Sequence, residues 1–257
     1  ITSGEHSDGN SWNSLDNPGT NKIEIKFSNG ITDDTTDSYI AHPAFTFGTD
    51  ELKGIWVAKY EASQGSTTNE VLVPTSTTSV AKSIPGVVSW TNITVSNMFD
   101  YAYNTYRNAD SHLMKNVEWG AVAYLTNAIG RIPYTNNYYV SYTIKTGYAG
   151  SSQDESSTIS PSSTYAWNTA NGVKASTTHN VYGIYDMSGG AAEYVSAYLN
   201  NGDSSLNSYA NSLVNATLKY KDVYPIGYSD SKGENYVAWS NIKGDAVYET
   251  SSYGSSS

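Results

Sequence analysis

Apolar residues in this chain occur in short runs, separated by long stretches of Ser, Thr, Asn, Gly and Tyr. Residues 64–82 are dominated by Ser and Thr, and the region 132–178 again contains few side chains that build a core. Segments of this composition favour surface loops over core elements. The 257 residues are enough for one sizeable core. We therefore expect one core surrounded by loops that carry most of the chain length.

The beginning of the sequence differs in composition from the rest. Residues 1–38 are rich in Gly, Asn, Asp and Ser, with one alternating stretch at 23–27 that is typical of a strand. We expect this segment to be an N-terminal arm or linker. The remaining sequence contains no fixed-period repeat and no Pro-rich or like-charge block. Residues 39–257 are therefore expected to form a single α+β domain.

Two kinds of regular structure are predicted inside this domain. Residues 44–47 and 54–61 are strand-like runs separated by a short polar segment, and they predict a hairpin. Residues 95–107 and 118–125 carry apolar side chains near helical spacing. We expect two helices whose apolar faces meet the same core.

The charge of the chain excludes one class of partner. With 24 acidic and 14 basic residues the formal net charge is −10, which disfavours the phosphate backbone of a nucleic acid. No window approaches the roughly 18 to 20 apolar residues that a membrane-spanning helix needs. We expect neither nucleic-acid binding nor membrane insertion.

Patterns typical of enzymes are missing from the sequence. The chain has no cysteine, which excludes disulfides, thiolate metal sites and cysteine nucleophiles. It has no Gly-x-Ser-x-Gly elbow, Walker loop, His-Glu-x-x-His helix or dinucleotide fingerprint. The four histidines, His6, His42, His112 and His179, are scattered singly, and His112 is expected to be a surface or capping side chain. We expect a protein that is not an enzyme.

Three segments carry a resemblance to a known family. Residues 54–63 read GIWVAKYEAS, residues 85–124 contain Val-Ser-Trp followed by a Glu-Trp helix start, and residues 180–194 read NVYGIYDMSGGAAEY. Together they resemble the formylglycine-generating enzyme and sulfatase-modifying-factor family, a branch of the C-type-lectin-like folds. The resemblance implies a formylglycine-generating-enzyme-like domain with two helices, short strands and long irregular loops.

The sequence departs from this family at two places. His112, Met114 and Lys115 stand where the family has Arg, Pro and Thr, so the usual cap of the second helix is lost, and we expect Ser111 or Asn116 to replace it. The family also continues with an Arg-Gly-Gly-Ser-Trp type strand, which is missing here. We therefore expect a domain that lacks its closing C-terminal strands and leaves a sheet edge to be covered.

The resemblance implies a fold rather than a reaction. The generating enzymes of the family hold copper with two of their own cysteines, and this chain has none. The family also wraps a structural Ca²⁺ in the third segment. Carried over, its ligands are Asp186, the carbonyl groups of Gly189 and Ala191, and Glu193, an oxygen set that suits Ca²⁺. The alternative is that Asp186 caps the turn and Glu193 pairs with a nearby base.

Tyrosine-rich polar loops suggest a function. Residues 134–148 and 220–253 combine Tyr with Ser, Asn and Gly, as antibody binding loops do. We expect these loops to bind a host-surface protein or glycan, so that the domain is an adhesion or receptor-recognition module on a cell surface or virion such as a phage tail. We expect the ligand to be contacted by Tyr138, Tyr139, Tyr142 and Tyr148.

The other aromatic residues have a different expected role. Trp56, Trp90, Trp119 and Tyr185 are expected in the core rather than at a ligand site.

Two other functions fit the same sequence. The protein is a structural subunit of a virion or extracellular filament if its loops and open C-terminal edge contact neighbouring subunits. It is a remnant or fragment of a formylglycine-generating-type oxidase if a catalytic segment has been lost.

Overall fold

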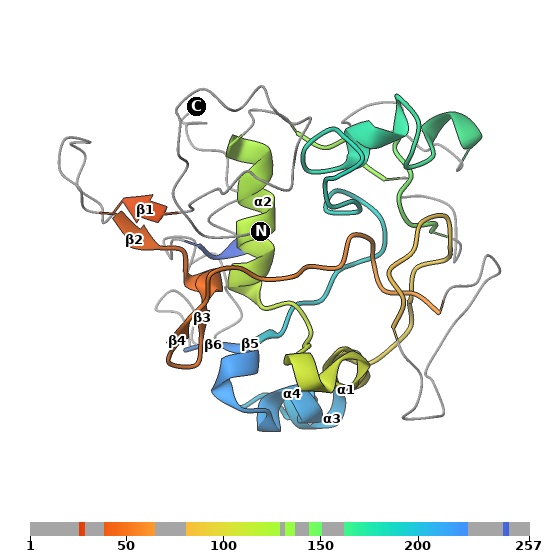
Figure 1. Ribbon diagram of the computed structural model, residues 1–257. Coiled ribbons are helices and arrows are strands. Elements are labelled where there is room, and N and C mark those ends of the chain that lie inside the picture. The colour runs from red at the N-terminus through yellow and green to blue at the C-terminus, as the bar shows by residue number, and fades with distance from the viewer. Residues whose placement is uncertain are drawn as a thin grey trace, which may run out of the picture.

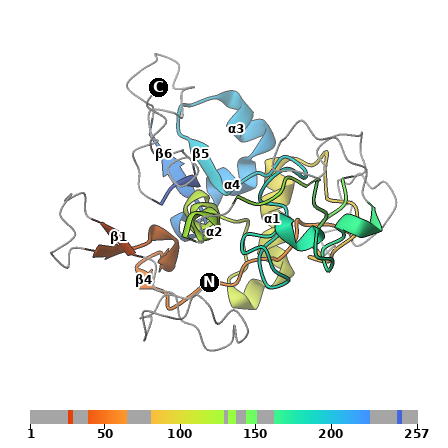
Figure 2. The same ribbon diagram turned by 90° about the horizontal axis from the view of Figure 1, so that it is seen from above.

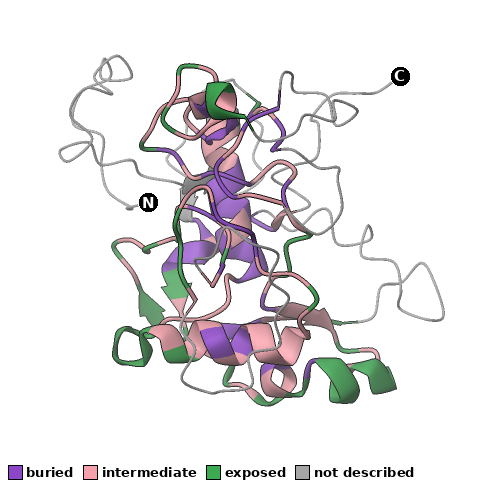
Figure 3. Cartoon of the chain, turned by 90° about the vertical axis from the view of Figure 1, so that its right-hand side faces the viewer, coloured by how far each residue is buried: buried purple, intermediate pink, exposed green. Residues whose placement is uncertain are grey.

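Helix α2 (Asn116–Ala128) runs through the centre of the molecule in the computed structural model (Figure 1). Val117 and Ala121 of this helix pack against Ala44 and Ile55. Most of the helix is buried, as Figure 3 shows. The residues that the structure describes are 26–28, 39–64, 81–128, 132–136, 144–150, 162–225 and 244–246.

A layer of three helices crosses one end of α2. Helix α1 (Val95–Thr105) packs against α4 (Asn211–Asn215), and α3 (Ser204–Tyr209) precedes α4 directly (Figure 1). The hydroxyl of Thr94 accepts a hydrogen bond from the backbone N–H of Asn97 and begins α1. The apolar face of α1 is buried against α4 and the turn that follows it.

The strands are short and form three separate two-stranded sheets in the described part of the chain. In the view from above, α2 is seen end-on between the β1–β2 pair and α1 (Figure 2). The bounds and pairings are as follows: β1 (Lys26–Ser28) with β2 (Tyr39–Ala41), antiparallel; β3 (Thr46–Phe47) with β4 (Asp50–Glu51), antiparallel; β5 (Ala197–Leu199) with β6 (Asp222–Tyr224), parallel. The 3₁₀ helices are Pro43–Phe45, Arg107–Ala109, Ser163–Tyr165, Gly172–Ala175 and Leu218–Tyr220.

Several predictions about the elements are confirmed. The mixed α+β class is confirmed, and both predicted helices are present as α1 and α2. The short helices α3 and α4 were not expected from the sequence, because neither is long enough to show a helical period. Strand β1 lies in the expected N-terminal arm and pairs with the first strand of the expected domain. In the described residues, no helix has the length and apolar character needed to cross a membrane.

The predicted hairpin between residues 44–47 and 54–61 is wrong. Pro43 begins a 3₁₀ helix there, and His42 caps it by accepting a hydrogen bond at Nδ1 from the N–H of Ala44 (3.1 Å). The hairpin that forms instead joins β3 to β4. Residues 54–61 form no strand, because their backbone pairs with loops and side chains, for example Tyr60 N–H with the Ser83 hydroxyl (3.0 Å).

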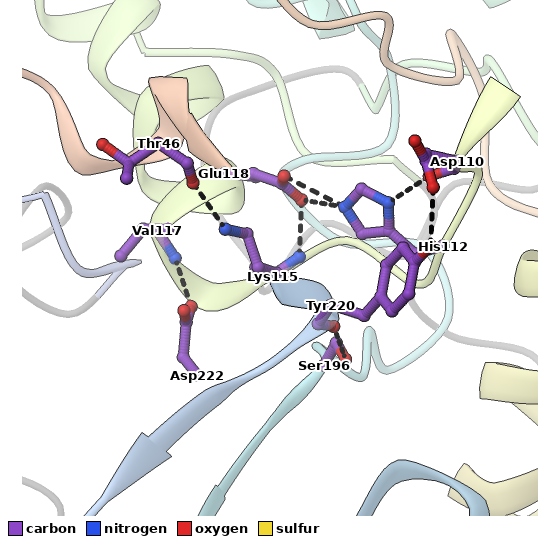
Figure 4. Close-up of polar contacts among 9 residues, drawn as sticks. All are labelled: Thr46, Asp110, His112, Lys115, Val117, Glu118, Ser196, Tyr220 and Asp222. Atoms are coloured by element: carbon purple, nitrogen blue, oxygen red, sulfur yellow. Dashed lines mark hydrogen bonds and ion pairs between the residues drawn. The ribbon is translucent and has the colours of Figure 1, made fainter. Parts of the chain in front are cut away.

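The start of α2 is capped by residues that the sequence did not indicate for this role. Glu118 accepts a hydrogen bond from the Lys115 N–H (2.8 Å), and Asp222 of β6 accepts one from the Val117 N–H (3.1 Å) (Figure 4). Carboxylates at this end also stabilise the helix dipole. Ser111, expected as a cap for this helix, instead bonds to Ala102 and Tyr106 at the end of α1. The side chains that cap α2 therefore come from its own first turn, Glu118, and from a distant strand, Asp222, rather than from the preceding loop.

Gly120 allows the C-terminal segment to approach α2. A Cβ atom at this position would overlap the carbonyl oxygen of Gly244. We expect Gly120→Ala to lower the free energy of unfolding by about 1–2 kcal/mol, because the overlap outweighs the roughly 1 kcal/mol that Ala gains over Gly in a helix. Urea denaturation measures this difference. A variant more stable than the wild type would show that residues 244–246 do not pack on α2.

Candidate functional site

Asp186 joins three loops beneath the surface of the molecule. Its side chain is buried and accepts hydrogen bonds from the Asn136 amide (2.6 Å), the Gly147 N–H (2.8 Å) and, at 3.4 Å, the Glu61 N–H. Asp186 itself has a positive φ of 66°, a conformation that Asp tolerates better than most residues. The segment after it is therefore held in one position by this carboxylate.

Glu61 is a second carboxylate in the same place. It accepts hydrogen bonds from the hydroxyl of Ser89 and from the backbone N–H of Ala191 (2.9 Å). Burial, followed by the negative charge of Asp186, raises the pKa of Glu61 well above its usual range. Burial likewise raises the pKa of Asp186 to about 6, although its N–H donors oppose the rise. The two acids thus anchor the 186–191 loop at the cost of a like-charge contact.

The outer side of this loop forms a pocket against α2. The pocket has a volume of about 430 Å³ and is open to solvent on one side. Its walls come from α2, from the segment 187–195 and from the C-terminal segment that packs at Gly120. The lining residues are Asn116, Trp119, Met187, Gly189, Ala191, Glu193, Val195 and Ala246.

Trp119 and Glu193 are joined inside this pocket. The indole Nε1–H donates a hydrogen bond to Glu193 Oε2 (2.6 Å), which fixes the position of both side chains. The pKa of Glu193 is raised to about 7. Burial by the surrounding protein atoms is the largest cause; the hydrogen bond from the indole N–H opposes the rise, and the charge of Asp186 adds to it. The outer part of Glu193 is exposed, so a ligand in the pocket can reach it.

The residues expected to hold Ca²⁺ lie in this region, and two of them make other contacts here. Both oxygens of Asp186 accept N–H donors, and Ala191 faces Glu61 with its N–H group. Among the described residues, no three His, Asp or Glu side chains are grouped so that they could hold a metal. The alternative prediction differs from the structure as well, because Asp186 bonds to three other loops rather than capping its own turn, and Glu193 bonds to an indole rather than to a base. The calcium site stays a prediction, and no step below depends on it.

The predicted tyrosine contacts lie largely outside the described residues. Tyr138, Tyr139 and Tyr142 belong to a segment that the structure does not describe. Tyr148 is half-buried and forms a bridge with Ala166 between two packed loops.

Two tyrosines of the second predicted loop are structural. The hydroxyl of Tyr220 donates a hydrogen bond to Asp110 (2.6 Å), and that of Tyr224 donates one to Asp245 (2.6 Å). Both tyrosines are buried, so the interpretation of residues 220–253 as one exposed binding loop is wrong at its beginning. Other tyrosines are exposed near this site: Tyr194, inside the segment 187–195, by 54%, and Tyr182, which precedes that segment, by 65%.

The aromatic residues expected in the core fall into two groups. Tyr185 is buried and stacks on Tyr60, and Trp90 packs against Tyr101, as predicted. Trp56 is exposed by 104%, so the expectation that it belongs to the core is wrong. Ile55 next to it points to α2, which turns the Trp56 side chain away from the protein.

His112 is neither a free surface residue nor part of a metal cluster in the described part of the chain. Its Nε2 lies 3.0 Å from Glu118 Oε1, and its Nδ1 lies 2.8 Å from the carbonyl oxygen of Asp110 (Figure 4). The ring stacks on Phe47. Burial lowers the pKa of His112, but Glu118 and the Asp110 carbonyl outweigh it, so the net shift is upward. Both ring nitrogens face acceptors, which is the environment of a protonated imidazole.

Sequence reasoning missed Glu61 and the role of Trp119. Glu61 belongs to one of the segments that carried the resemblance, but nothing local distinguishes it from a solvated acid. Trp119 was assigned to the core from its residue type. The run Val57 to Ala62 also contains Lys59, so the position of Glu61 in it gave no clear signal of burial.

No protein-family model matches this chain, and no curated protein shows significant similarity to it. The resemblance to the formylglycine-generating enzyme family therefore stays a prediction.

Proposed function

We propose that this protein is a non-catalytic recognition module with a C-type-lectin-like fold, displayed outside the cell or on a virion, which binds a host-surface protein or glycan. The observation that carries the proposal is the pocket beside α2, where Trp119 and the carboxylate of Glu193 converge. The pocket is shallow and widely open to solvent, so a ligand there would lie against the indole of Trp119 and the carboxylate of Glu193 rather than be enclosed.

An exposed aromatic side chain beside the pocket supports the proposal of a binding surface. Tyr194 directly follows the lining residue Glu193 in the sequence and is exposed by 54%. Tyrosine contributes large contact area at low entropy cost, so this residue extends the contact surface.

The test is binding of the chain to glycan and host-surface protein arrays, with Trp119→Ala as the informative variant. We expect at least a tenfold loss of affinity, about 1.4 kcal/mol, because the variant removes the aromatic wall. Trp56→Ala is the matched control, since it removes an exposed Trp that does not line the pocket. Circular dichroism of both variants establishes that they fold.

Three outcomes would contradict the proposal or redirect it. Binding that Trp119→Ala leaves unchanged would place the ligand elsewhere. Equal losses for Trp119→Ala and Trp56→Ala would indicate a broad surface rather than the pocket. Binding only to other copies of the chain, seen by sedimentation, would favour the structural subunit of a virion or filament.

A further inference from the structure

The side chains that line the pocket have already used their hydrogen-bond donors. The indole N–H of Trp119 is bonded to Glu193, and the amide Nδ2 of Asn116 donates to the hydroxyl of Tyr224 (2.9 Å). In contrast, Glu193 Oε1 makes no hydrogen bond with any residue that the structure describes. The chemistry left over for a ligand is therefore an acceptor oxygen of a carboxyl group whose pKa is about 7, which is ionised above that pH and which a bound cation stabilises in its ionised form.

This charge is not balanced by a cation within the described chain. The ion pairs found there are those of His112 with Glu118 and of Lys219 with Asp110. The eight lining residues that belong to the described part of the chain include one acid and no base. Behind the pocket, Asp186 adds negative potential, because its pKa of about 6 leaves it mostly ionised at pH 7, whereas the raised pKa of Glu61 favours its neutral form. The potential in the pocket favours a positive ligand.

We infer that the pocket binds an organic cation, an ammonium or guanidinium group that is held between the indole of Trp119 and the free oxygen of Glu193. This inference rests on the proposed function and names the ligand class of the same site. An indole attracts a desolvated cation through its ring electrons, and a carboxylate forms its strongest hydrogen bonds with charged donors. Glu193 is the one carboxylate among the described lining residues, which is too few for a metal ion.

A neutral sugar fits the pocket less well than a cation. Sugar hydroxyls need donors and acceptors together, whereas the lining side chains Trp119 and Asn116 have committed their donors. The cation itself has several natural sources: a Lys or Arg side chain of a protein, a choline headgroup or an amino sugar. The experiment separates these sources.

The test is isothermal titration of the full chain with four cationic probes and their neutral partners. The cationic probes are Nα-acetyl-lysine amide, Nα-acetyl-arginine amide, choline and glucosamine; the neutral partners are Nα-acetyl-norleucine amide for the two amino-acid amides, 3,3-dimethylbutanol for choline and N-acetylglucosamine for glucosamine. We expect at least one cationic probe to bind tighter than its neutral partner. Which probe binds tightest assigns the source of the cation.

Two variants make the test specific for the pocket. Glu193→Gln keeps an acceptor for the indole and the shape of the side chain but removes the charge, so binding of the cation should weaken by about tenfold or more. Trp119→Phe keeps an aromatic ring, lowers affinity less than Trp119→Ala and reports the contribution of the ring. Titration with Ca²⁺ tests the predicted calcium site separately, and a Ca²⁺ heat that disappears in Glu193→Gln would assign this carboxylate to a metal and overturn the inference.

The outcomes separate this inference from the proposed function. Array binding that depends on Trp119 but is not competed by any cationic probe would overturn the inference and leave the proposed function standing. Cationic probes that bind in a Glu193-dependent way, without any array ligand, would support the inference and count against the host-surface partner. Equal affinity for cationic and neutral probes, or unchanged affinity in Glu193→Gln, would also overturn the inference.

Discussion

Replacing Asp186 by Ala is expected to lower the free energy of unfolding by about 4 kcal/mol, the largest effect that we predict for a single substitution. The substitution leaves the Asn136 amide and the Gly147 N–H without their acceptor inside the protein. It also places Ala at a positive φ of 66°. Urea denaturation monitored by tryptophan fluorescence measures the loss.

Asp186→Asn is the milder variant of the same test. Asn accepts the left-handed conformation and keeps one acceptor oxygen, so the expected loss is about 1–2 kcal/mol. If Asp186→Ala were no more costly than Asp186→Asn, the buried hydrogen bonds of this carboxylate would not stabilise the loop.

Glu61→Gln should raise the free energy of unfolding at neutral pH. Gln accepts the hydrogen bond from Ala191 and donates one to Ser89, while the repulsion with Asp186 disappears. The pKa values of both acids are raised in the folded state. At pH values between the ordinary pKa range of a carboxylic acid and about 6, the folded state therefore binds more protons than the unfolded state. Their contribution to stability therefore falls as pH rises through this window. We expect a smaller fall in Glu61→Gln, and an unchanged pH profile would contradict the contact between the two acids.

Replacing Glu118 by Ala is expected to cost about 3 kcal/mol at about pH 6, because it removes the acceptor of two groups at the start of α2. These groups are the Lys115 N–H and the ring of His112. Lys115 keeps a second contact through its ammonium group, which donates to the carbonyl oxygen of Thr46 (3.2 Å) (Figure 4). The loss is measured by denaturation at several pH values.

The pH dependence identifies the part that His112 contributes. The raised pKa of His112 means that its contribution is complete below the pKa of an unfolded His, about 6.5, and is lost as pH rises through the folded value. Glu118→Ala should therefore cost more at about pH 6 than at about pH 9. His112→Arg keeps a planar cation at both pH values. The fall in its free energy of unfolding from about pH 6 to about pH 9 should therefore be smaller than that of the wild type. An equal cost of Glu118→Ala at both pH values would show that His112 is neutral in the fold.

The local part of the fold was predictable from the sequence. Helices α1 and α2 were predicted because a helical period of apolar residues depends only on neighbours within a few turns. The third resemblance segment also drew attention to Asp186 and Glu193, which the structure places behind and inside one pocket. The failed hairpin shows the limit of such patterns, since strand-like runs form a sheet only where a partner strand is present.

The decisive contacts of the candidate site came from the tertiary structure alone. The Val117–Asp222 cap spans 105 residues, the Glu61–Asp186 contact 125, and the Trp119–Glu193 bond 74. Sequence by itself determined the composition, the absence of cysteine, the loop-rich α+β class and two helices. Which carboxylates meet, and which keeps a free oxygen, was decided only by packing, because hydrogen bonds between distant loops leave no periodic trace in the sequence.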